Sequence, residues 1–266
     1  MFIKQYFPKL YERLQLIKME FNHYKVTSLS RENKALKQLC DIHKGKRCFI
    51  IATGPSLTLE DLELLKDEIC IGVNSIAKSF SKTKWRPQYL CIMDGRIWPK
   101  VKNEVETYSS EISKIFLGHN IHSDVENAIY IKRDEIASTY LETEYYKTHN
   151  VIPSKYTFYI PKHLERYLCD GSTVVISAIQ LAIYMGCNEI YLLGTDCNYQ
   201  KNIKYSDLTK YDNIPLPDNV ENKMFSCYKS IRSEVEAKYP KVSIYNATRG
   251  GMLEVFERKD LDTLFM

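Results

Sequence analysis

The sequence predicts an α/β protein with a Rossmann-like, doubly wound and mostly parallel sheet. Short, continuously apolar runs, typical of strands buried on both faces, recur along the chain and end in small polar residues. These runs alternate with segments of helical periodicity, an order typical of parallel sheets. A chain of 266 residues with 44% hydrophobic side chains is long enough for one such core. Its ten Gly and nine Pro are too few for a collagenous or disordered chain.

Residues 1–40 are expected to form an amphipathic helical arm, and residues 41–266 the Rossmann-like domain. Apolar side chains recur at alternating spacings of four and three, which lines one face of a helix. They are Ile3, Phe7, Leu10, Leu14, Ile17, Phe21 and Tyr24. Between residues 3 and 24, and at Lys25, basic residues outnumber acidic ones. Such a helix can lie on an anionic membrane surface, associate with a second copy, or pack on its own domain.

The domain begins with a strand, a glycine turn and a helix. The run 48–53 is the first strand, the turn follows at residues 54–56, and Thr58 is the expected N-cap of the helix. Further strands are expected at 69–73 and 88–93, which end at Asn74 and Asp94.

Residues 96–168 have no clear period as a whole and are interpreted as a lid-like insertion. Two apolar runs within it, 115–117 and 128–131, indicate further strands. Order returns with a helix over 174–185, which residues 170–173 cap, and a strand over 189–193. A helix over about 220–239 and a strand over 242–246 complete the domain.

Polar and glycine residues follow several of these strands or precede a helix. Because a doubly wound sheet brings such positions to one edge, they predict a nucleotide site, although ordinary capping accounts for each one singly. The turn itself has neither a dinucleotide-binding nor a P-loop spacing; it is either a phosphate or ribose site or a plain βα turn. The predicted binding residues are Gly54, Pro55, Ser56, Asn74, Ser172, Thr173, Gly194, Asp196, Asn198 and Tyr199.

Candidates for a catalytic base are Asp94, His163 and His149. Asp94 follows a strand, whereas both histidines fall in the expected lid, where a histidine is more often structural. The pair Asp260 and Asp262 is interpreted as a helix cap and not as a metal site. We expect no tightly bound metal or cofactor. The eight cysteines form no C-x-x-C pair and are expected to be reduced.

Three blocks of the sequence resemble a bacterial family of unknown function encoded with surface-polysaccharide genes. The blocks are 45–57, 171–199 and 244–256. That family is similar to the hydroxymethylpterin diphosphokinase-like proteins and, distantly, to bacterial sialyltransferases that use CMP-sugars. The resemblance implies that Gly54, Ser56 and Thr173 lie near the nucleotide phosphate, Asn74 and Asp94 near the ribose and the sugar, and Tyr199 near the leaving phosphate. The histidine that the sialyltransferases hold ahead of their last long helix has no counterpart in residues 219–228.

These observations lead to the expectation of a glycosyltransferase that moves a sugar from a nucleotide donor, with a CMP-sugar favoured, to a surface-glycan or lipid-linked precursor. A Mg²⁺-dependent diphosphokinase acting on a pterin-like alcohol is the alternative, and a non-catalytic nucleotide-binding subunit is the third. The net charge of +4 is too small and too dispersed beyond the arm for a nucleic-acid partner. No signal-peptide pattern is present, so the cytoplasm, with peripheral attachment at the membrane, is the expected location.

Overall fold

The computed structural model describes residues 6–149, 152–198, 206–209 and 220–266. Eight strands form one sheet in the order β10-β9-β8-β1-β2-β3-β4-β5, and every strand pairing among the described residues is parallel. The predicted α/β fold is therefore confirmed, with a sheet that is all-parallel. The strands are β1 (Arg47–Ile51), β2 (Cys70–Val73), β3 (Tyr89–Ile92), β4 (Lys114–Gly118), β5 (Ala128–Ile131), β8 (Glu189–Leu193), β9 (Ser243–Asn246) and β10 (Glu257–Arg258).

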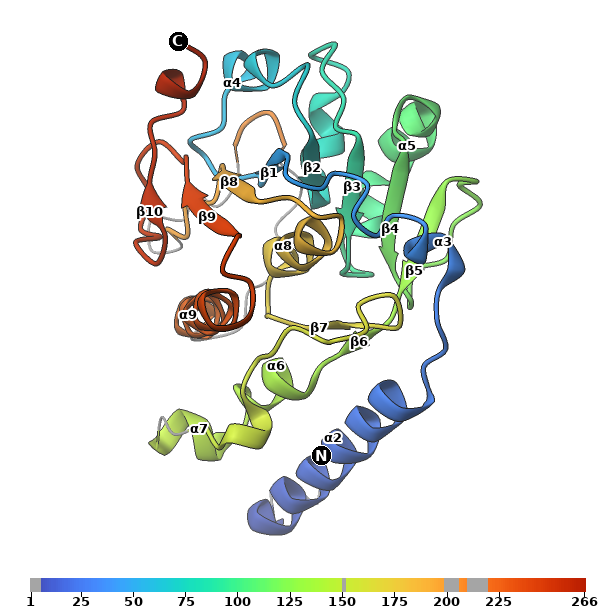
Figure 1. The fold of residues 1–266 in the computed structure, drawn as a ribbon. Helices are drawn as coiled ribbons and strands as arrows, with labels where there is room; N and C mark the ends of the chain where they lie inside the picture. Colours follow the sequence, from blue (N-terminus) through green and yellow to red (C-terminus); the bar gives the residue numbers. More distant parts are fainter. Residues whose placement is uncertain (1–5, 150–151, 199–205, 210–219) are drawn as a thin grey trace.

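Helices cover both faces of the sheet (Figure 1). Within β1, Cys48 and Ile50 pack toward α8 and α9, whereas Phe49 and Ile51 pack toward α4 and α5. This alternation explains the continuously apolar sequence of β1, because both faces of the strand are buried. The helices are α2 (Pro8–Leu29), α3 (Lys34–Lys37), α4 (Leu59–Leu64), α5 (Trp98–Tyr108), α6 (Ile136–Tyr140), α7 (Glu144–His149), α8 (Val174–Tyr184) and α9 (Val220–Lys238), with 3-10 turns η1 (Asn74–Ser79), η2 (Ser109–Glu111), η3 (Ser154–Tyr156) and η4 (Asp262–Leu264).

The strand order reverses between β1 and β8. From β1 the chain runs outward through β2, β3, β4 and β5, and it then returns to the other side of β1 as β8. Ile51 at the end of β1 pairs with Leu193 at the end of β8, so the two following turns lie together. The Gly54 N–H donates to the Gly194 carbonyl over 2.7 Å. Ligands of open α/β sheets bind at such a reversal, outside the carboxyl ends of the strands.

The local signals at two helix starts explain where these helices begin. Thr58 caps α4 and forms a reciprocal capping box with Asp61, as the predicted N-cap requires. Thr173 caps α8, and the helix ends before Gly186, which has a φ of +86°.

The region expected to be an insertion divides into two parts. Residues 96–131 contain α5 and the strands β4 and β5, and the two strands extend the main sheet. Residues 132–170 instead contain α6, α7, η3 and a separate two-stranded sheet of β6 (Arg133–Asp134) and β7 (Leu168–Cys169). The two strands predicted within this region, 115–117 and 128–131, coincide with β4 and β5.

The arm is helical, as predicted, over Pro8–Leu29, and it leaves the sheet domain at its lower end (Figure 1). It packs on α6 and its neighbours through Met19, which is buried in a cluster with Ile136 and Tyr140. The predicted apolar stripe does not make this contact: its described residues Phe7 to Tyr24 are exposed. The helix therefore packs on its own domain through a different side from the one the spacing suggested. No described helix combines the length and the apolar character needed to cross a bilayer.

Candidate functional site

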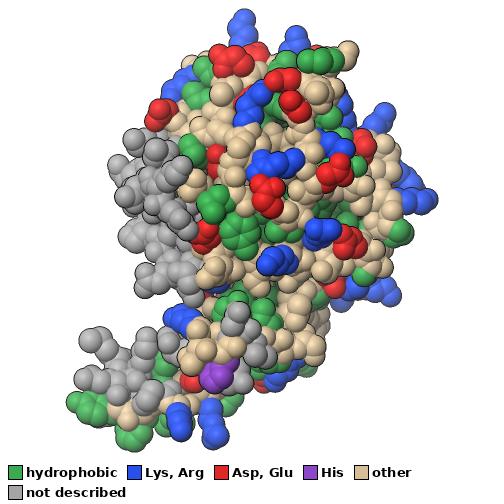
Figure 2. All heavy atoms as spheres, turned by 90° about the vertical axis from the view of Figure 1, so that its left-hand side faces the viewer, with side chains coloured by type: hydrophobic (Ala, Val, Ile, Leu, Met, Phe, Trp, Pro, Cys, Tyr) green, Lys and Arg blue, Asp and Glu red, His purple; other side chains and the backbone are tan. Residues whose placement is uncertain are grey.

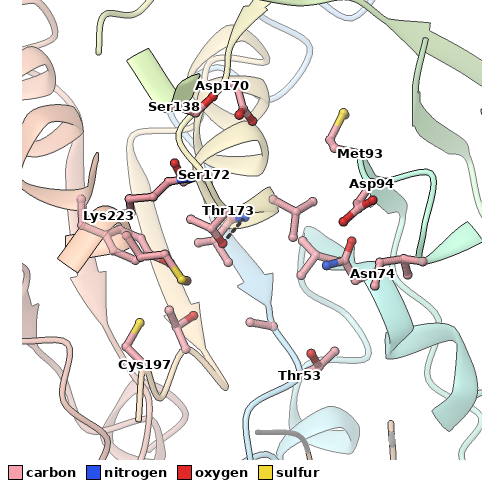
Figure 3. Close-up of a pocket in the computed structure, with 18 of the residues that line it drawn as sticks. Thr53, Asn74, Met93, Asp94, Ser138, Asp170, Ser172, Thr173, Cys197 and Lys223 are labelled. Carbon is pink, nitrogen blue, oxygen red and sulfur yellow. Dashed lines mark hydrogen bonds between the residues drawn. The ribbon is translucent and has the colours of Figure 1, made fainter. Parts of the chain in front are cut away.

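A cavity of about 430 Å³ lies at the carboxyl edge of the sheet, over the reversal between β1 and β8 (Figure 3). Its walls come from the ends of β1, β2, β3 and β8, the start of α8, the inner side of α9 and residues 133–142. The fold thus brings most of the predicted residues together. Those that line the cavity are Gly54, Pro55, Asn74, Asp94, Ser172, Thr173, Gly194, Asp196 and Asn198.

Three of the predicted residues that the structure describes are not among the lining. Ser56 is bound to a lining residue instead: its hydroxyl donates to the Asp196 carboxylate over 2.8 Å. His163 is exposed and lies 3.1 Å from Glu165, and His149 is exposed at the end of α7. Tyr199 lies outside the described residues. Neither histidine therefore lines this cavity, because His149 ends α7 and His163 lies in the loop between η3 and β7.

The β1 turn and the β8 turn are fastened to each other by Asp196. Its Oδ2 accepts from the Ser56 hydroxyl and its Oδ1 from the Ser56 N–H, over 2.8 and 3.3 Å. A Cβ on Gly54 would lie 1.9 Å from Asp196 Oδ2, so the carboxylate fills the space above the glycine. Burial raises the pKa of Asp196, and the hydrogen bonds from Ser56 oppose that rise. The Ser56 donors of the glycine turn are thus already used by the Asp196 carboxylate, and the Gly54 N–H is used by the Gly194 carbonyl.

Three cavity residues other than glycine have left-handed backbone conformations. Asn74 has a φ of +48°, Ser172 of +61° and Cys197 of +50°. Such conformations are rare outside glycine and cluster at functional sites. The buried Oδ1 of Asn74 has no hydrogen-bond partner among the described residues, although a buried acceptor normally has one. Figure 3 shows the Asn74 side chain at the cavity. This oxygen is therefore available to a hydroxyl or amine of a ligand.

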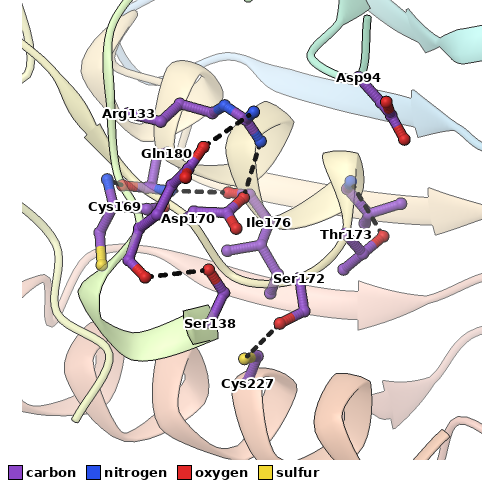
Figure 4. A network of polar contacts seen from close by, with 12 residues as sticks. Asp94, Arg133, Ser138, Cys169, Asp170, Ser172, Thr173, Ile176, Gln180 and Cys227 are labelled. Carbon is purple, nitrogen blue, oxygen red and sulfur yellow. Dashed lines mark hydrogen bonds and ion pairs between the residues drawn. The ribbon is translucent and has the colours of Figure 1, made fainter. Parts of the chain in front are cut away.

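The amino end of α8 also opens onto the cavity, at Ser172–Val175. The first N–H groups of a helix are unpaired within it and carry the positive end of its dipole, which suits an anion. A polar network holds this end in place (Figure 4). Gln180 of α8 bonds both the N–H and the carbonyl of Cys169, and Arg133 donates to Asp170 over 3.0 Å.

Charged side chains of both signs face the cavity. The Arg96 guanidinium binds the Asp94 carboxylate, with a shortest N–O distance of 2.7 Å. Burial acts to raise the pKa of Asp94, but hydrogen bonds from the Arg96 side chain and backbone, with the charge of Arg133, hold it below its ordinary value. Asp94 is therefore ionised at neutral pH.

Lys223 is a cavity residue that the sequence analysis missed. It lies on α9, its side chain is only 7% exposed, and its ammonium group pairs with Glu142. The signal in the sequence that could have identified Lys223 is its place on an otherwise buried side of α9, next to Met224 and one turn before Cys227. Arg133, Ser138 and Thr139 were missed because residues 132–142 had no recognisable pattern.

Asp260 and Asp262, near the end of the chain, both have partners within the protein. Asp260 accepts a hydrogen bond from the Asp262 N–H over 2.9 Å, and Asp262 pairs with Arg249 over 2.8 Å. Across the part of the chain that the structure describes, no three His, Cys, Asp or Glu side chains are placed to share a metal ion. All eight cysteines are free thiols, and all but Cys40 are buried.

Comparisons with known proteins place these observations in context. A family model described as "6-hydroxymethylpterin diphosphokinase MptE-like" matches residues 22–202. No curated protein matches the sequence. Among solved structures, the MAf glycosyltransferase from Magnetospirillum magneticum AMB-1 has a similar fold, with a TM-score of 0.55 and 16% sequence identity. The similarity covers 87% of this chain but only 38% of that one.

Proposed function

The chain belongs to the MptE-like family of 6-hydroxymethylpterin diphosphokinase-like proteins. From this premise we propose that it is a transferase with a nucleotide substrate, and specifically a glycosyltransferase that uses a nucleotide sugar. The observation that carries the proposal is the cavity at the sheet reversal, where an unpartnered acceptor, a helix amino end and a buried lysine face one space. Each of these groups suits one part of a nucleotide sugar.

The nucleoside is assigned to the side of the cavity formed by β1 and β2. Asn74 Oδ1, buried and unpartnered, can accept a hydrogen bond from a ribose hydroxyl or a base amine. Thr53, Gly54 and Pro55 provide the neighbouring wall. The turn around Gly54 acts here as a surface, because its Ser56 donors are bound to Asp196.

The phosphate is assigned to the amino end of α8. The amino end of α8 would face the leaving phosphate with its backbone N–H groups, apart from that of Val175, which donates to the Thr173 hydroxyl. The Lys223 ammonium lies in the same cavity. Transfer requires the bond between the anomeric carbon and the phosphate oxygen to break, with the electron pair leaving on the nucleotide. A fixed cation and a helix amino end stabilise the charge that develops there. A CMP-sugar, which leaves as CMP, is the favoured donor class.

Asp94 is the proposed general base. It faces the cavity from the end of β3, is ionised, and would take the proton of an acceptor hydroxyl as its oxygen attacks the anomeric carbon. The acceptor is assigned to the wall of residues 133–142, which adds Arg133, Ser138 and Thr139. The acceptor class we propose is a surface-glycan or lipid-linked precursor.

The second candidate is transfer of diphosphate from ATP to a pterin-like alcohol, which the name of the matching family model favours. That reaction uses Mg²⁺, which one or two carboxylates and the substrate phosphates can hold together. Asp94 and Asp170 are the carboxylates in the cavity that would serve. The same nucleotide position would then be occupied by ATP. A subunit that binds nucleotide without turnover is the third reading.

A ligand panel separates these functions. Thermal unfolding is measured with CMP, UDP, GDP, ADP and ATP, each with and without Mg²⁺; a ligand at 100 times its Kd stabilises by about 2.7 kcal/mol. Stabilisation by CMP without metal, followed by release of CMP from CMP-sugars, supports the glycosyltransferase. Stabilisation by ATP only with Mg²⁺, with AMP formed in the presence of a pterin alcohol, favours the diphosphokinase. Binding without turnover identifies a binding subunit, and no binding in the panel contradicts the nucleotide site itself.

A further inference from the structure

Among the described residues, helix α2 contacts the domain through the side that carries Met19, Glu20 and His23. Met19 is buried against α6, and the His23 ring lies 2.7 Å from the buried Asp134 carboxylate. The Glu20 carboxylate accepts hydrogen bonds from Lys155 and Tyr156 over 2.7 and 2.6 Å. These contacts fix which side of the helix faces outward.

The outward side carries an apolar stripe, here called the outer stripe. Six large apolar side chains follow one another at alternating spacings of three and four, which places them in one line along the helix. Each is 47–62% exposed. Single exposed apolar residues are ordinary, but a continuous row of this kind marks an interaction surface. The outer stripe consists of Phe7, Leu10, Leu14, Ile17, Phe21 and Tyr24.

Positive charges flank the outer stripe on both sides. Helix geometry places Lys18 and Lys25 along one flank and Lys9 and Arg13 along the other, and all four are exposed. The Lys25 ammonium lies 5.3 Å from the centre of the Phe21 ring. Glu20, on the second flank, is already paired with Lys155. The surface around the stripe is therefore cationic.

This charge pattern disfavours a second copy as the occupant. In an antiparallel pair of helices, the flank with Lys18 and Lys25 would face the same flank of its partner. In a parallel pair, Arg13 would lie opposite Lys18 of the other helix. An anionic lipid surface has no such conflict, and each Lys or Arg near it strengthens binding.

We propose that the outer stripe of α2 docks on an anionic bilayer surface. The apolar side chains would enter the boundary between headgroups and acyl chains, and the four cations would meet the lipid phosphates. Tyr24 is of the aromatic type that favours this boundary, and Phe7 and Phe21 suit the apolar face of a helix that lies in it. In Figure 2, the lower part of the molecule, where Figure 1 shows α2 and α7, presents hydrophobic side chains next to Lys and Arg side chains.

Docking also orients the candidate site. A second cavity, of about 900 Å³, lies between α2 and residues 132–142, and Lys9, Lys18 and Lys25 line it. It shares Arg133, Glu135, Thr139 and Glu142 with the first cavity. The wall assigned to the acceptor would thus lie directly behind the docked helix, close to the bilayer surface, which fits a lipid-linked acceptor. This last step, unlike the docking itself, rests on the proposed function.

Vesicle flotation with the full chain tests the docking. The protein is expected to float with vesicles of phosphatidylcholine and phosphatidylglycerol, and far less with phosphatidylcholine alone. The double variant I17E/F21E is expected to lose this binding about tenfold or more, since burial of one large apolar side chain is worth roughly that factor. The matched control is L64E on α4, an exposed apolar residue at the opposite end of the molecule (Figure 1). The variant K18E/K25E should lose the preference for anionic lipid, whereas K66E/K102E should keep it.

Three results would overturn the docking. One is equal flotation of I17E/F21E and the unaltered chain, and another is equal binding to neutral and anionic vesicles. The third is a dimer in light scattering that I17E/F21E dissociates, without vesicle binding, which would assign the stripe to a second copy. Nucleotide binding is measured in parallel without vesicles. Its absence would contradict the proposed function and leave the docking intact, and its retention in I17E/F21E shows that the variant is folded.

Discussion

The Asp196 carboxylate occupies the position that a side chain at Gly54 would need. A Cβ there would lie 1.9 Å from Asp196 Oδ2 and 2.5 Å from the Gly194 carbonyl oxygen. The glycine is therefore required by the close approach of the turns after β1 and β8, and the same approach builds the floor of the cavity.

The substitution Gly54→Ala is expected to destabilise the fold by about 3 kcal/mol or more, because both overlaps exceed what small shifts relieve. Adding Asp196→Ala removes only the first overlap, since the Gly194 oxygen belongs to the backbone. The double variant should thus remain less stable than D196A alone. Urea unfolding of the three variants measures this, and full recovery in the double variant would contradict the role of the Gly194 carbonyl.

Asn74→Gly is expected to weaken nucleotide binding about two- to tenfold with little change in stability. Glycine accepts the φ of +48° without strain, and the variant removes the side chain that carries the unpartnered acceptor. Asn74→Ala, in comparison, should also lose about 1 kcal/mol of stability, because alanine is strained in this conformation. Calorimetric titration with the nucleotide found in the panel, together with thermal unfolding, separates the two effects. Unchanged affinity in N74G would remove Asn74 from the site.

The sequence predicts a residue's role best where a local signal determines it. Thr58, Thr173 and Gly186 end or begin helices through their own chemistry, and their roles agree with the structure. The gathering of Asn74 and Asp94 at one edge follows from the parallel sheet. These predictions depend on period and capping, which a single sequence contains.

Other features depend on contacts between distant segments, which no local pattern records. The pairing of Ser56 with Asp196 joins residues 140 positions apart, and that of Lys223 with Glu142 joins residues 81 apart. The exposure of the outer stripe also depends on contacts between distant segments. Its spacing predicted a helix correctly, but Met19, outside that spacing, makes the buried contact.

Lys223→Met is expected to reduce affinity for a nucleotide about tenfold, equivalent to about 1.4 kcal/mol, and to affect the corresponding nucleoside far less. The reason is that Lys223 is the buried cation of the cavity wall formed by α9, and a phosphate is the group it would contact. Lys229→Met, an exposed lysine on the same helix, is the matched control. Equal losses for nucleotide and nucleoside would indicate a structural role instead of phosphate binding.

The stability of the fold is expected to rise with pH below the ordinary histidine pKa of 6.5. Burial lowers the pKa of His43, whose Nε2 lies 2.8 Å from the Tyr89 hydroxyl. The unfolded chain then binds a proton that the folded chain does not, so stability is complete above 6.5 and falls as the pH decreases below it. His43→Gln should reduce this slope and leave the contribution of His119, whose pKa burial also lowers. Urea unfolding at several pH values measures the slope, and an identical slope in H43Q would contradict the assignment.

Arg96→Gln is expected to move the acid limb of the pH–rate profile to higher pH if Asp94 is the base. In the unaltered protein, burial raises the pKa of Asp94 but the Arg96 hydrogen bonds and charge bring it below its ordinary 3.8. The base is therefore ionised, and the rate independent of its titration, down to about that pH. Without the guanidinium the effect of burial is less opposed, so protonation of Asp94, and with it loss of activity, begins at a higher pH.

Turnover of the nucleotide donor is followed from acid to neutral pH in R96Q and in the control variant R232Q, which alters an exposed arginine of α9. A profile that shifts only in R96Q supports Asp94 as the base, whereas a uniform drop in rate with an unmoved limb would assign Arg96 to substrate binding and leave the base to another residue.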